Sequence, residues 1–210
     1  SSAQGDAQTP TRRNHNQPSS IMDKTALLTF NPELKHKWRA VLDQVLPFNK
    51  WDTEDELAWL CEAASMSTRI LELGSYCGVS TKAMALANPD AAIYCIDLWE
   101  DAGSREAFNN LLGKEINAQK VFADNNSTAR GLNLLSRTSM RFDMVFIDAG
   151  HLYVDVGCDI TLSRPFLLPN SILSGHDYRV NLPEDGVTKA VCELVPTHKV
   201  VADSIWAAVV

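Results

Sequence analysis

The sequence predicts an α/β domain built on a doubly wound, seven-stranded sheet that is mostly parallel and has an antiparallel last strand. Short aliphatic and aromatic runs, typical of buried strands, alternate along the chain with longer segments of helical spacing. A turn bracketed by glycines joins the first run to a helix, as in nucleotide-binding folds. Only Asp203 and Ser204 separate the last two runs, which favours an antiparallel hairpin at the edge of the sheet.

Length and composition favour a single domain with a tail. The chain has 210 residues, 45% of them hydrophobic, which is enough for one core. Residues 1–20 contain no large aliphatic or aromatic side chain and no apolar core of a secretory signal. We therefore expect residues 1–24 to be a disordered tail and residues 25–210 to form one domain that begins with two helices. No apolar run is long enough to span a bilayer, so no membrane partner is expected.

Charge and cysteine content narrow the function further. A net charge of −7 gives no electrostatic attraction to nucleic acid, so we expect no nucleic-acid partner. The five cysteines are an odd number without a C-x-x-C pair, and most fall inside apolar segments. We expect buried thiols, a reducing and therefore cytoplasmic location, and no zinc site.

Two helices are predicted before the first strand. Residues 32–46 place apolar side chains at helical spacing, with Pro32 suited to the first turn and Pro47 ending the helix. Thr53 and Glu56 then form the capping box of a second helix. These helices either cover a ligand site or simply pack on the sheet.

The first strand, residues 70–73, carries the main signal. It leads into a turn between Gly74 and Gly78, and a helix opens near Ser80. This spacing departs from the G-x-G-x-x-G pattern of dinucleotide sites. Glu72, just before the turn, would repel a pyrophosphate but would attract a positively charged sulfonium or amino group. The alternative is that Glu72 closes the strand and the glycines form an ordinary tight turn.

The second strand, residues 91–97, ends in an acid. Asp97 follows Gly74 by 23 residues, close to the spacing at which nucleotide-binding folds present a carboxylate to ribose hydroxyls. Trp99 follows, and we expect it at the rim. The alternative is an exposed acid at a strand end.

A helix over residues 104–117 and a short third strand, residues 120–123, come next. The polar stretch after this strand contains Asp124 and Ser127. Either could bind a ligand or cap the following helix, and the sequence leaves both open.

The fourth and fifth strands deliver titratable side chains to the sheet edge where ligands bind in open α/β folds. Residues 144–147 and 171–175 form the two strands. Together their ends carry Asp148, His151, His176 and Asp177. Such a cluster can hold a divalent cation, or one imidazole can act as a general base near neutral pH.

The remaining elements complete the sheet. Residues 153–165 are predicted to be helical, and Pro169 and Asn170 turn the chain into the fifth strand. A helix over residues 186–195 precedes the hairpin of residues 199–210.

Five motifs occur in a specific order: ELGSYCGVST, CIDLW, FDMVFIDAGH, SGHDY and GVTKAV. With them, residues 50–210 resemble the class I S-adenosylmethionine-dependent methyltransferases of family-24 type, among them macrolide-sugar O-methyltransferases, whose fold is Rossmann-like. The resemblance implies S-adenosylmethionine as cofactor and methyl transfer to an oxygen of a small hydroxylated molecule. It implies a cofactor site formed by Glu72, Gly74, Ser75, Tyr76, Gly78, Ser80, Asp97, Leu98, Trp99, Asp124 and Asp148. Asp124 is the first candidate for the adenine amino group and Ser127 the second.

The resemblance also implies roles at the last two strand ends. His151 would be the base, while Asp148 and Asp177 would be metal ligands together with His176. His176 stands where the related enzymes have an acid, and imidazole is a poorer magnesium ligand than carboxylate. Magnesium, manganese and no metal therefore all stay open.

Other functions are compatible with parts of the pattern. A non-catalytic S-adenosylmethionine-binding protein of the same fold is the main alternative, and His176 favours it. The acidic balance argues against a nucleic-acid methyltransferase, and the glycine spacing argues against a nicotinamide dehydrogenase. The acceptor is not determined by the sequence, and neither is the oligomeric state, for which a homo-oligomer is one option.

Overall fold

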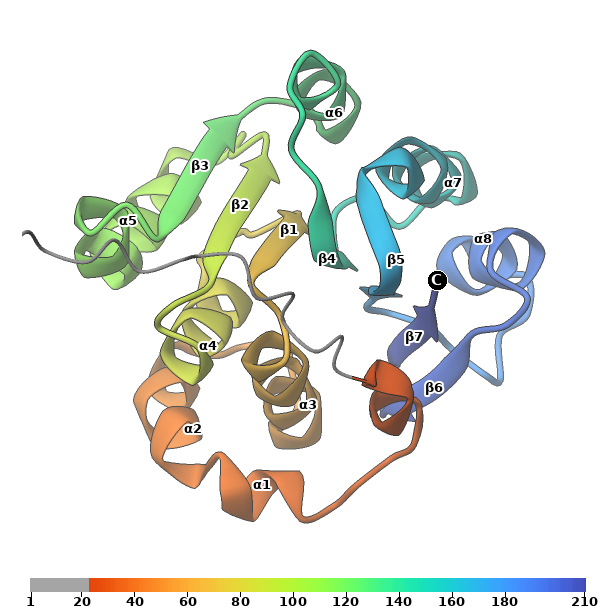
Figure 1. The fold of residues 1–210 in the computed structure, drawn as a ribbon, viewed down its shortest axis with the longest axis horizontal. Helices are drawn as coiled ribbons and strands as arrows, with labels where there is room; N and C mark the ends of the chain where they lie inside the picture. The colour runs from red at the N-terminus through yellow and green to blue at the C-terminus, as the bar shows by residue number, and fades with distance from the viewer. Residues whose placement is uncertain (1–22) are drawn as a thin grey trace, which may run out of the picture.

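The computed structural model describes residues 23–210 and confirms the predicted architecture (Figure 1). The seven strands are β1 (Arg69–Leu73), β2 (Ala92–Asp97), β3 (Val121–Asn125), β4 (Phe142–Ile147), β5 (Leu167–Gly175), β6 (Lys199–Ala202) and β7 (Ile205–Val209). They lie in the order β3-β2-β1-β4-β5-β7-β6, and β7 is antiparallel to both of its neighbours. The direction in which strands are added reverses between β1 and β4, which is where open α/β sheets bind ligands.

Helices cover both faces of the sheet. The α-helices are α1 (Leu34–Lys37), α2 (Arg39–Val45), α3 (Glu54–Ser65), α4 (Val79–Ala87), α5 (Ala102–Asn117), α6 (Thr128–Leu135), α7 (Tyr153–Ser163) and α8 (Gly186–Leu194). Short 3-10 helices are η1 (Lys24–Leu28), η2 (Leu46–Phe48) and η3 (Arg164–Phe166).

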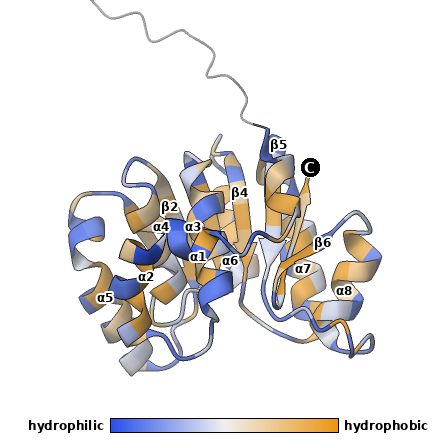
Figure 2. Ribbon diagram, turned by 90° about the horizontal axis from the view of Figure 1, so that it is seen from below, coloured by the Kyte–Doolittle hydropathy of each residue, from blue (hydrophilic) through white to orange (hydrophobic). Residues whose placement is uncertain are grey.

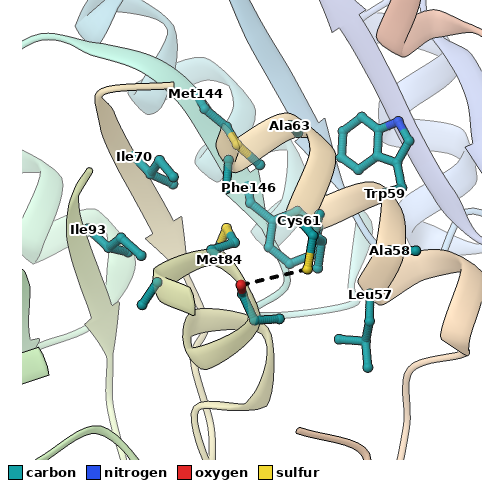
Figure 3. Close-up of a cluster of buried hydrophobic side chains, with 14 of the residues drawn as sticks. Leu57, Ala58, Trp59, Cys61, Ala63, Ile70, Met84, Ile93, Met144 and Phe146 are labelled. Carbon is teal, nitrogen blue, oxygen red and sulfur yellow. Dashed lines mark hydrogen bonds between the residues drawn. The ribbon is translucent and has the colours of Figure 1, made fainter. Parts of the chain in front are cut away.

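The core has two halves, one on each face of the sheet. Alternation along β1 sends Ile70 to the face covered by α3, α4 and α5, and Leu71 and Leu73 to the face covered by α6, α7 and α8. Figure 3 shows part of the first half, where side chains of α3 face those of β1, β2 and β4. Apolar residues colour the strands between the two helical layers, and polar residues lie on the outer helix surfaces (Figure 2). The doubly covered sheet explains why its strands are short apolar runs.

The predicted helix over residues 32–46 is broken in two at Trp38. The indole Nε1 of Trp38 donates to the Glu62 carboxylate of α3 at 2.9 Å. Leu34 on one side of the break and Leu42 on the other are both buried in the core. Helical spacing alone does not reveal a tertiary contact of this kind.

The predicted tail lies outside the described residues except at its end. Asp23 caps η1 by accepting from the Thr25 backbone, and Lys24 is buried, with Nζ donating to Ser67 Oγ and to the Asp143 carbonyl. Asp23 and Lys24, which the prediction assigned to the tail, thus belong to an ordered 3-10 helix and its cap, because the lysine amine has partners inside the fold.

The expectation of mostly buried cysteines is wrong. Cys61 and Cys95 are buried and Cys77 is half-buried, but Cys158 and Cys192 are exposed, and all five are free thiols. The last two lie within apolar sequence on α7 and α8, yet they face outward because neighbours in sequence point to different sides of a helix.

Strand β5 begins earlier than predicted, so Pro169 and Asn170 lie inside it instead of forming a turn before it. Its pairing with β4 shifts register between Phe142 and Met144, and Asn170 has φ +62°. Proline is tolerated at such a bulge because the ladder is interrupted there. Among residues 23–210, no helix combines the length and the apolarity needed to cross a membrane.

Candidate functional site

The glycine turn after β1 packs against the chain that leaves β4. Gly74 has φ +84°, and a Cβ placed there would lie 2.1 Å from the carbonyl oxygen of Asp148. Gly78 has φ +86° and forms the cap of α4, against Phe108 and Leu112 of α5. Both positions require glycine for conformation and for space. The turn therefore brings the α4 N-terminus and the end of β4 to one edge of the sheet.

Glu72 lies beneath this turn, not in the cleft. Alternation along β1 points it to the same face as Ile70, and it is fully buried. Its carboxylate accepts hydrogen bonds from the hydroxyls of Ser75 and Ser80, both at 2.6 Å, and from Thr81 Oγ1. Burial raises the pKa of Glu72, and these hydroxyls act in the opposite direction. The side chain holds the turn to α4, and it has no surface exposed to a ligand.

Asp97 braces the same turn from the end of β2. Its Oδ2 accepts from the backbone N–H groups of Ser75 at 2.8 Å and Tyr76 at 2.9 Å. Its Oδ1 accepts from the Trp99 N–H at 2.6 Å. A carboxylate has about four acceptor sites, so Asp97 keeps capacity for one hydroxyl at the cleft.

Trp99 differs from its predicted place at the rim. The residue is 6% exposed, and its indole packs on Phe108, with the Arg105 guanidinium 4.1 Å from the centre of the indole ring. Its Nε1 donates to the Tyr76 carbonyl at 2.7 Å, so it supports the turn from behind. Leu98, which is 50% exposed, and Tyr76 are the apolar side chains that reach the surface here.

The polar stretch after β3 divides between strand and cap. Asp124 lies within β3 and accepts a hydrogen bond from the Asn126 side-chain amide. Ser127 is the N-cap of α6 and accepts from the Arg130 backbone at 3.4 Å. The structure thus gives Ser127 the capping role that the sequence had left open.

A pocket opens between this turn and the segment that links α2 to α3. Its empty volume is about 460 Å³, part of it open to solvent. It is lined by Phe48, Asn49, Lys50, Trp51, Asp52, Tyr76, Cys77, Val79, Ser80 and Asp148. The predicted Ser80 and Asp148 therefore share a cavity with residues from the N-terminal segment.

The ends of β4 and β5 bring the predicted histidines and acids together. His151 is largely exposed, with 63% of its side chain accessible, and its Nε2 lies 3.0 Å from Asp177 Oδ2. Asp177 has φ +61°, and Arg179 approaches its other oxygen at 3.7 Å. His176, the neighbouring histidine, points inward and is only 9% exposed.

His176 lies among carboxylates. Its Nε2 is 3.2 Å from Glu56 Oε1, an ion-pair distance without hydrogen-bond alignment, and its Nδ1 is 3.5 Å from Asp148 Oδ1 and 3.7 Å from Asp177 Oδ2. Burial lowers the pKa of His176, but the facing carboxylates outweigh it and raise the pKa to about 12. His176 also holds the pKa of Asp177 below its usual range.

Two acids of this cluster were not predicted as site residues. Glu56 is 2% exposed, and although burial raises its pKa, contacts with His176, Ser204 and Thr53 bring it down to about 2. Burial and the nearby charge of Asp148 raise the pKa of Asp52 to about 6. Glu56 was visible in the sequence as half of a capping box, but no sequence signal connects it with His176.

Residues 71–178, half of the chain, match the family described as "Methyltransferase domain", number 24 of that name. The chain belongs to this methyltransferase family. No curated protein matches the methyltransferase in sequence.

Solved structures share its fold. One is the O-methyltransferase TomG from Streptomyces achromogenes, which is involved in tomaymycin synthesis and was solved with S-adenosylmethionine. The sequence identity is 18%, the match covers 89% of this chain and 93% of TomG, and the TM-score is 0.64. An O-methyltransferase from Bacillus cereus, solved with S-adenosylhomocysteine, has 12% identity, coverage of 89% and 95%, and a TM-score of 0.60. A methyltransferase from Podospora anserina, also with S-adenosylhomocysteine, has 16% identity, coverage of 85% and 87%, and a TM-score of 0.57.

The methyltransferase thus brings together most of the residues predicted from its sequence. These residues lie at the carboxyl ends of the parallel strands, which share one edge of the sheet. The turn follows β1, Asp97 and Leu98 lie at the end of β2, and Asp124 lies near the end of β3. Asp148 and Asp177 follow β4 and β5. Glu72 and Trp99 lie behind that edge and support it.

Proposed function

We propose that this methyltransferase binds S-adenosylmethionine and transfers its methyl group to an oxygen of a small hydroxylated molecule. The carrying observation is that the braced glycine turn and the His151–Asp177 pair lie at one edge of the sheet, on either side of Asp148. The structures of TomG and of the Bacillus cereus protein, both named O-methyltransferases, support the reaction type.

The cofactor site follows from the carboxylates and the turn. The free acceptor site of Asp97 suits a ribose hydroxyl, and the turn from Gly74 to Gly78 lines the methionine portion. Leu98 offers an apolar surface to the adenine, and Asp124 an acceptor to its amino group. The acids Asp148 and Asp52 border the pocket that would take the positively charged amino and sulfonium groups.

Glu72 contributes indirectly in this proposal. A buried carboxylate that holds three hydroxyls fixes the shape of the turn. Its contribution is to position the backbone, so the direct contact with the cofactor implied by the resemblance is replaced by a supporting role.

His151 would take the proton of the acceptor hydroxyl. Its Nε2 lies 3.0 Å from Asp177 Oδ2, and from this contact we assign the hydrogen of the neutral ring to Nε2, which leaves Nδ1 able to accept a proton. Displacement at a sulfonium methyl needs alignment and a deprotonated acceptor, and few other groups. The loss of a general base typically costs a factor of about 100 to 10,000 in rate.

The test is a turnover assay. The intact chain is mixed with S-adenosylmethionine and a library of hydroxylated small molecules, and S-adenosylhomocysteine is measured. We expect turnover with at least one acceptor, and a loss of about 100-fold or more in kcat for His151→Ala with unchanged affinity for S-adenosylmethionine. His36→Ala, at an exposed position on α1, is the matched control and should keep full activity.

Cofactor binding without turnover against any acceptor would instead favour the non-catalytic binding protein. Equal activity of His151→Ala and the intact chain would remove His151 from the mechanism.

A further inference from the structure

The resemblance implies a divalent cation at the ends of β4 and β5. Whether such an ion fits depends on which donor atoms the side chains there can offer. Magnesium takes about six oxygen ligands in near-octahedral geometry, and manganese accepts an imidazole only through an unprotonated nitrogen. Donor atoms lie within 4.8 Å of one another in two groups: Asp52, Glu56 and His176, and Asp148, His151 and Asp177. Distance alone would therefore allow an ion.

The orientation of His176 argues against one. Its Nε2 faces Glu56 at 3.2 Å, and its Nδ1 faces Asp148 and Asp177 at 3.5 and 3.7 Å. Carboxylate oxygens within ion-pair distance of both nitrogens favour the doubly protonated, charged ring, although the Nε2–Glu56 contact is not aligned as a hydrogen bond. With a carboxylate on each side, neither nitrogen of His176 has a lone pair for a metal. The first group is thereby lost as a ligand set.

The two carboxylates of the second group already face imidazole nitrogens. Asp177 Oδ2 lies 3.0 Å from His151 Nε2 and 3.7 Å from His176 Nδ1, and Asp148 Oδ1 faces the same ring. An ion between Asp148 and Asp177 would replace these contacts and would lie next to a positively charged, buried imidazole.

The ring is also held in this orientation. Glu56 accepts from the Thr53 N–H at 2.7 Å through one oxygen, and from the Ser204 N–H and hydroxyl at 2.9 and 2.7 Å through the other. Thr53 is the cap of α3 and Ser204 is in the β6–β7 turn, so two distant parts of the chain fix the acid that faces His176. Turning the ring away would leave Glu56 buried without its cation.

We propose that His176, held by Glu56, takes the place of the divalent cation between Asp148 and Asp177, so that this chain binds no metal at the candidate site. The inference rests on the proposed function only for the location of the site. Its consequence is that the charge beside His151 comes from a fixed side chain, so the electrostatics of the site do not depend on the supply of an ion.

The first experiment uses the intact chain without cofactor. Histidines are labelled with ¹⁵N, Mn²⁺ is added, and the paramagnetic broadening of each ring signal is followed. We expect His151 and His176 to broaden no more than the exposed His36, and His176 to show two protonated nitrogens throughout. Selective, saturable broadening of His151 and His176 that Mg²⁺ reverses would overturn the proposal.

The second experiment restores a carboxylate. His176→Glu should gain saturable Mn²⁺ binding by calorimetry, at least about tenfold tighter than the intact chain, because metal affinity follows ligand identity and count. His176→Gln, and His36→Glu as a charge-matched control on α1, should gain none. A folded His176→Glu without Mn²⁺ binding would contradict the claim that the imidazole excludes the ion. If this variant does not fold, the labelled intact chain decides the question.

Titration of the same samples with S-adenosylmethionine is a separate readout. Failure to bind the cofactor would count against the proposed function, whereas metal binding would count only against the role of His176.

Discussion

The two halves of the site are built differently. At the ends of β1 and β2, the hydrogen bonds that Glu72 and Asp97 accept within residues 23–210 come from uncharged donors, namely hydroxyls, a thiol and backbone N–H groups. At the ends of β4 and β5, carboxylates face imidazoles, and Glu56 and His176 form a buried ion pair. The first half fixes the shape of a turn, whereas the second fixes the placement of charge.

The difference shows in how protonation affects each half. In the turn half, burial raises the pKa of Glu72, so ionising this group at higher pH works against the fold. In the charged half, the pKa values of Glu56 and His176 move in opposite directions, toward the ionised form of each. We therefore expect turn variants to act on shape and cofactor affinity, and variants of the ion pair to act on pH dependence.

The largest effect is expected for Gly74→Ala. The added Cβ would meet the Asp148 carbonyl at 2.1 Å in a left-handed conformation, so something in the backbone must move. We expect the free energy of unfolding to fall by more than about 4 kcal/mol in urea titrations, together with loss of cofactor binding.

Gly113→Ala in the middle of α5 is the matched control, because a Cβ there meets no atom within 4 Å. It should raise the free energy of unfolding by up to about 1 kcal/mol. Similar values for the two variants would show that the turn is not as constrained as its geometry indicates.

Next in size is His176→Gln, which leaves Glu56 without its cation. Breaking a buried pair from one side costs about 3 to 5 kcal/mol. The pKa of His176 is raised from 6.5 to about 12, so the stability it contributes is complete below about pH 6.5 and is lost as the pH rises toward 12. The pKa of Glu56 is lowered from 4.5 to about 2, so its contribution is present above about pH 4.5 and is lost as the pH falls toward 2.

Urea unfolding across the pH range checks both signs. Above about pH 6.5, the intact chain should lose stability more steeply than His176→Gln, whose slope there should be flatter. Equal slopes for the two proteins would mean that His176 does not carry the charge assigned to it.

A smaller effect is expected for Glu72→Gln. The amide keeps the volume of the side chain but loses one acceptor oxygen for the hydroxyls of Ser75, Ser80 and Thr81. We expect a loss of about 1 to 2 kcal/mol in unfolding free energy and a drop in cofactor affinity of less than about tenfold, both by calorimetry. A complete loss of binding with an intact fold would instead indicate direct contact between Glu72 and the cofactor.

Much of this site could be predicted because parallel strands end at one edge. The apolar runs located β1, β2, β4 and the hairpin, and the acids that follow those strands had to lie near one another. The alternation of side chains along β1 also indicates that Glu72 is buried, because Glu72 points to the same face of the sheet as Ile70. That signal was outweighed by the expectation of a ligand contact.

The rest depends on contacts between distant segments. Glu56 and Ser204 are 148 residues apart, and neither the capping box nor the hairpin turn indicates that they meet beside His176. At the break in the first helix, Trp38 likewise donates a hydrogen bond to Glu62 of another helix. Local patterns describe single elements, and these features arise only when the elements pack.

Calorimetric titration of the intact chain with S-adenosylmethionine tests the central claim most directly, with Asp97→Ala and the surface variant Asp90→Ala compared under the same conditions. The account predicts one saturable site, weakened about tenfold or more in Asp97→Ala and unchanged in Asp90→Ala, because a charge-assisted hydrogen bond and the brace of the turn are both lost at Asp97. No saturable binding to the folded chain, or equal affinity in all three proteins, would contradict it.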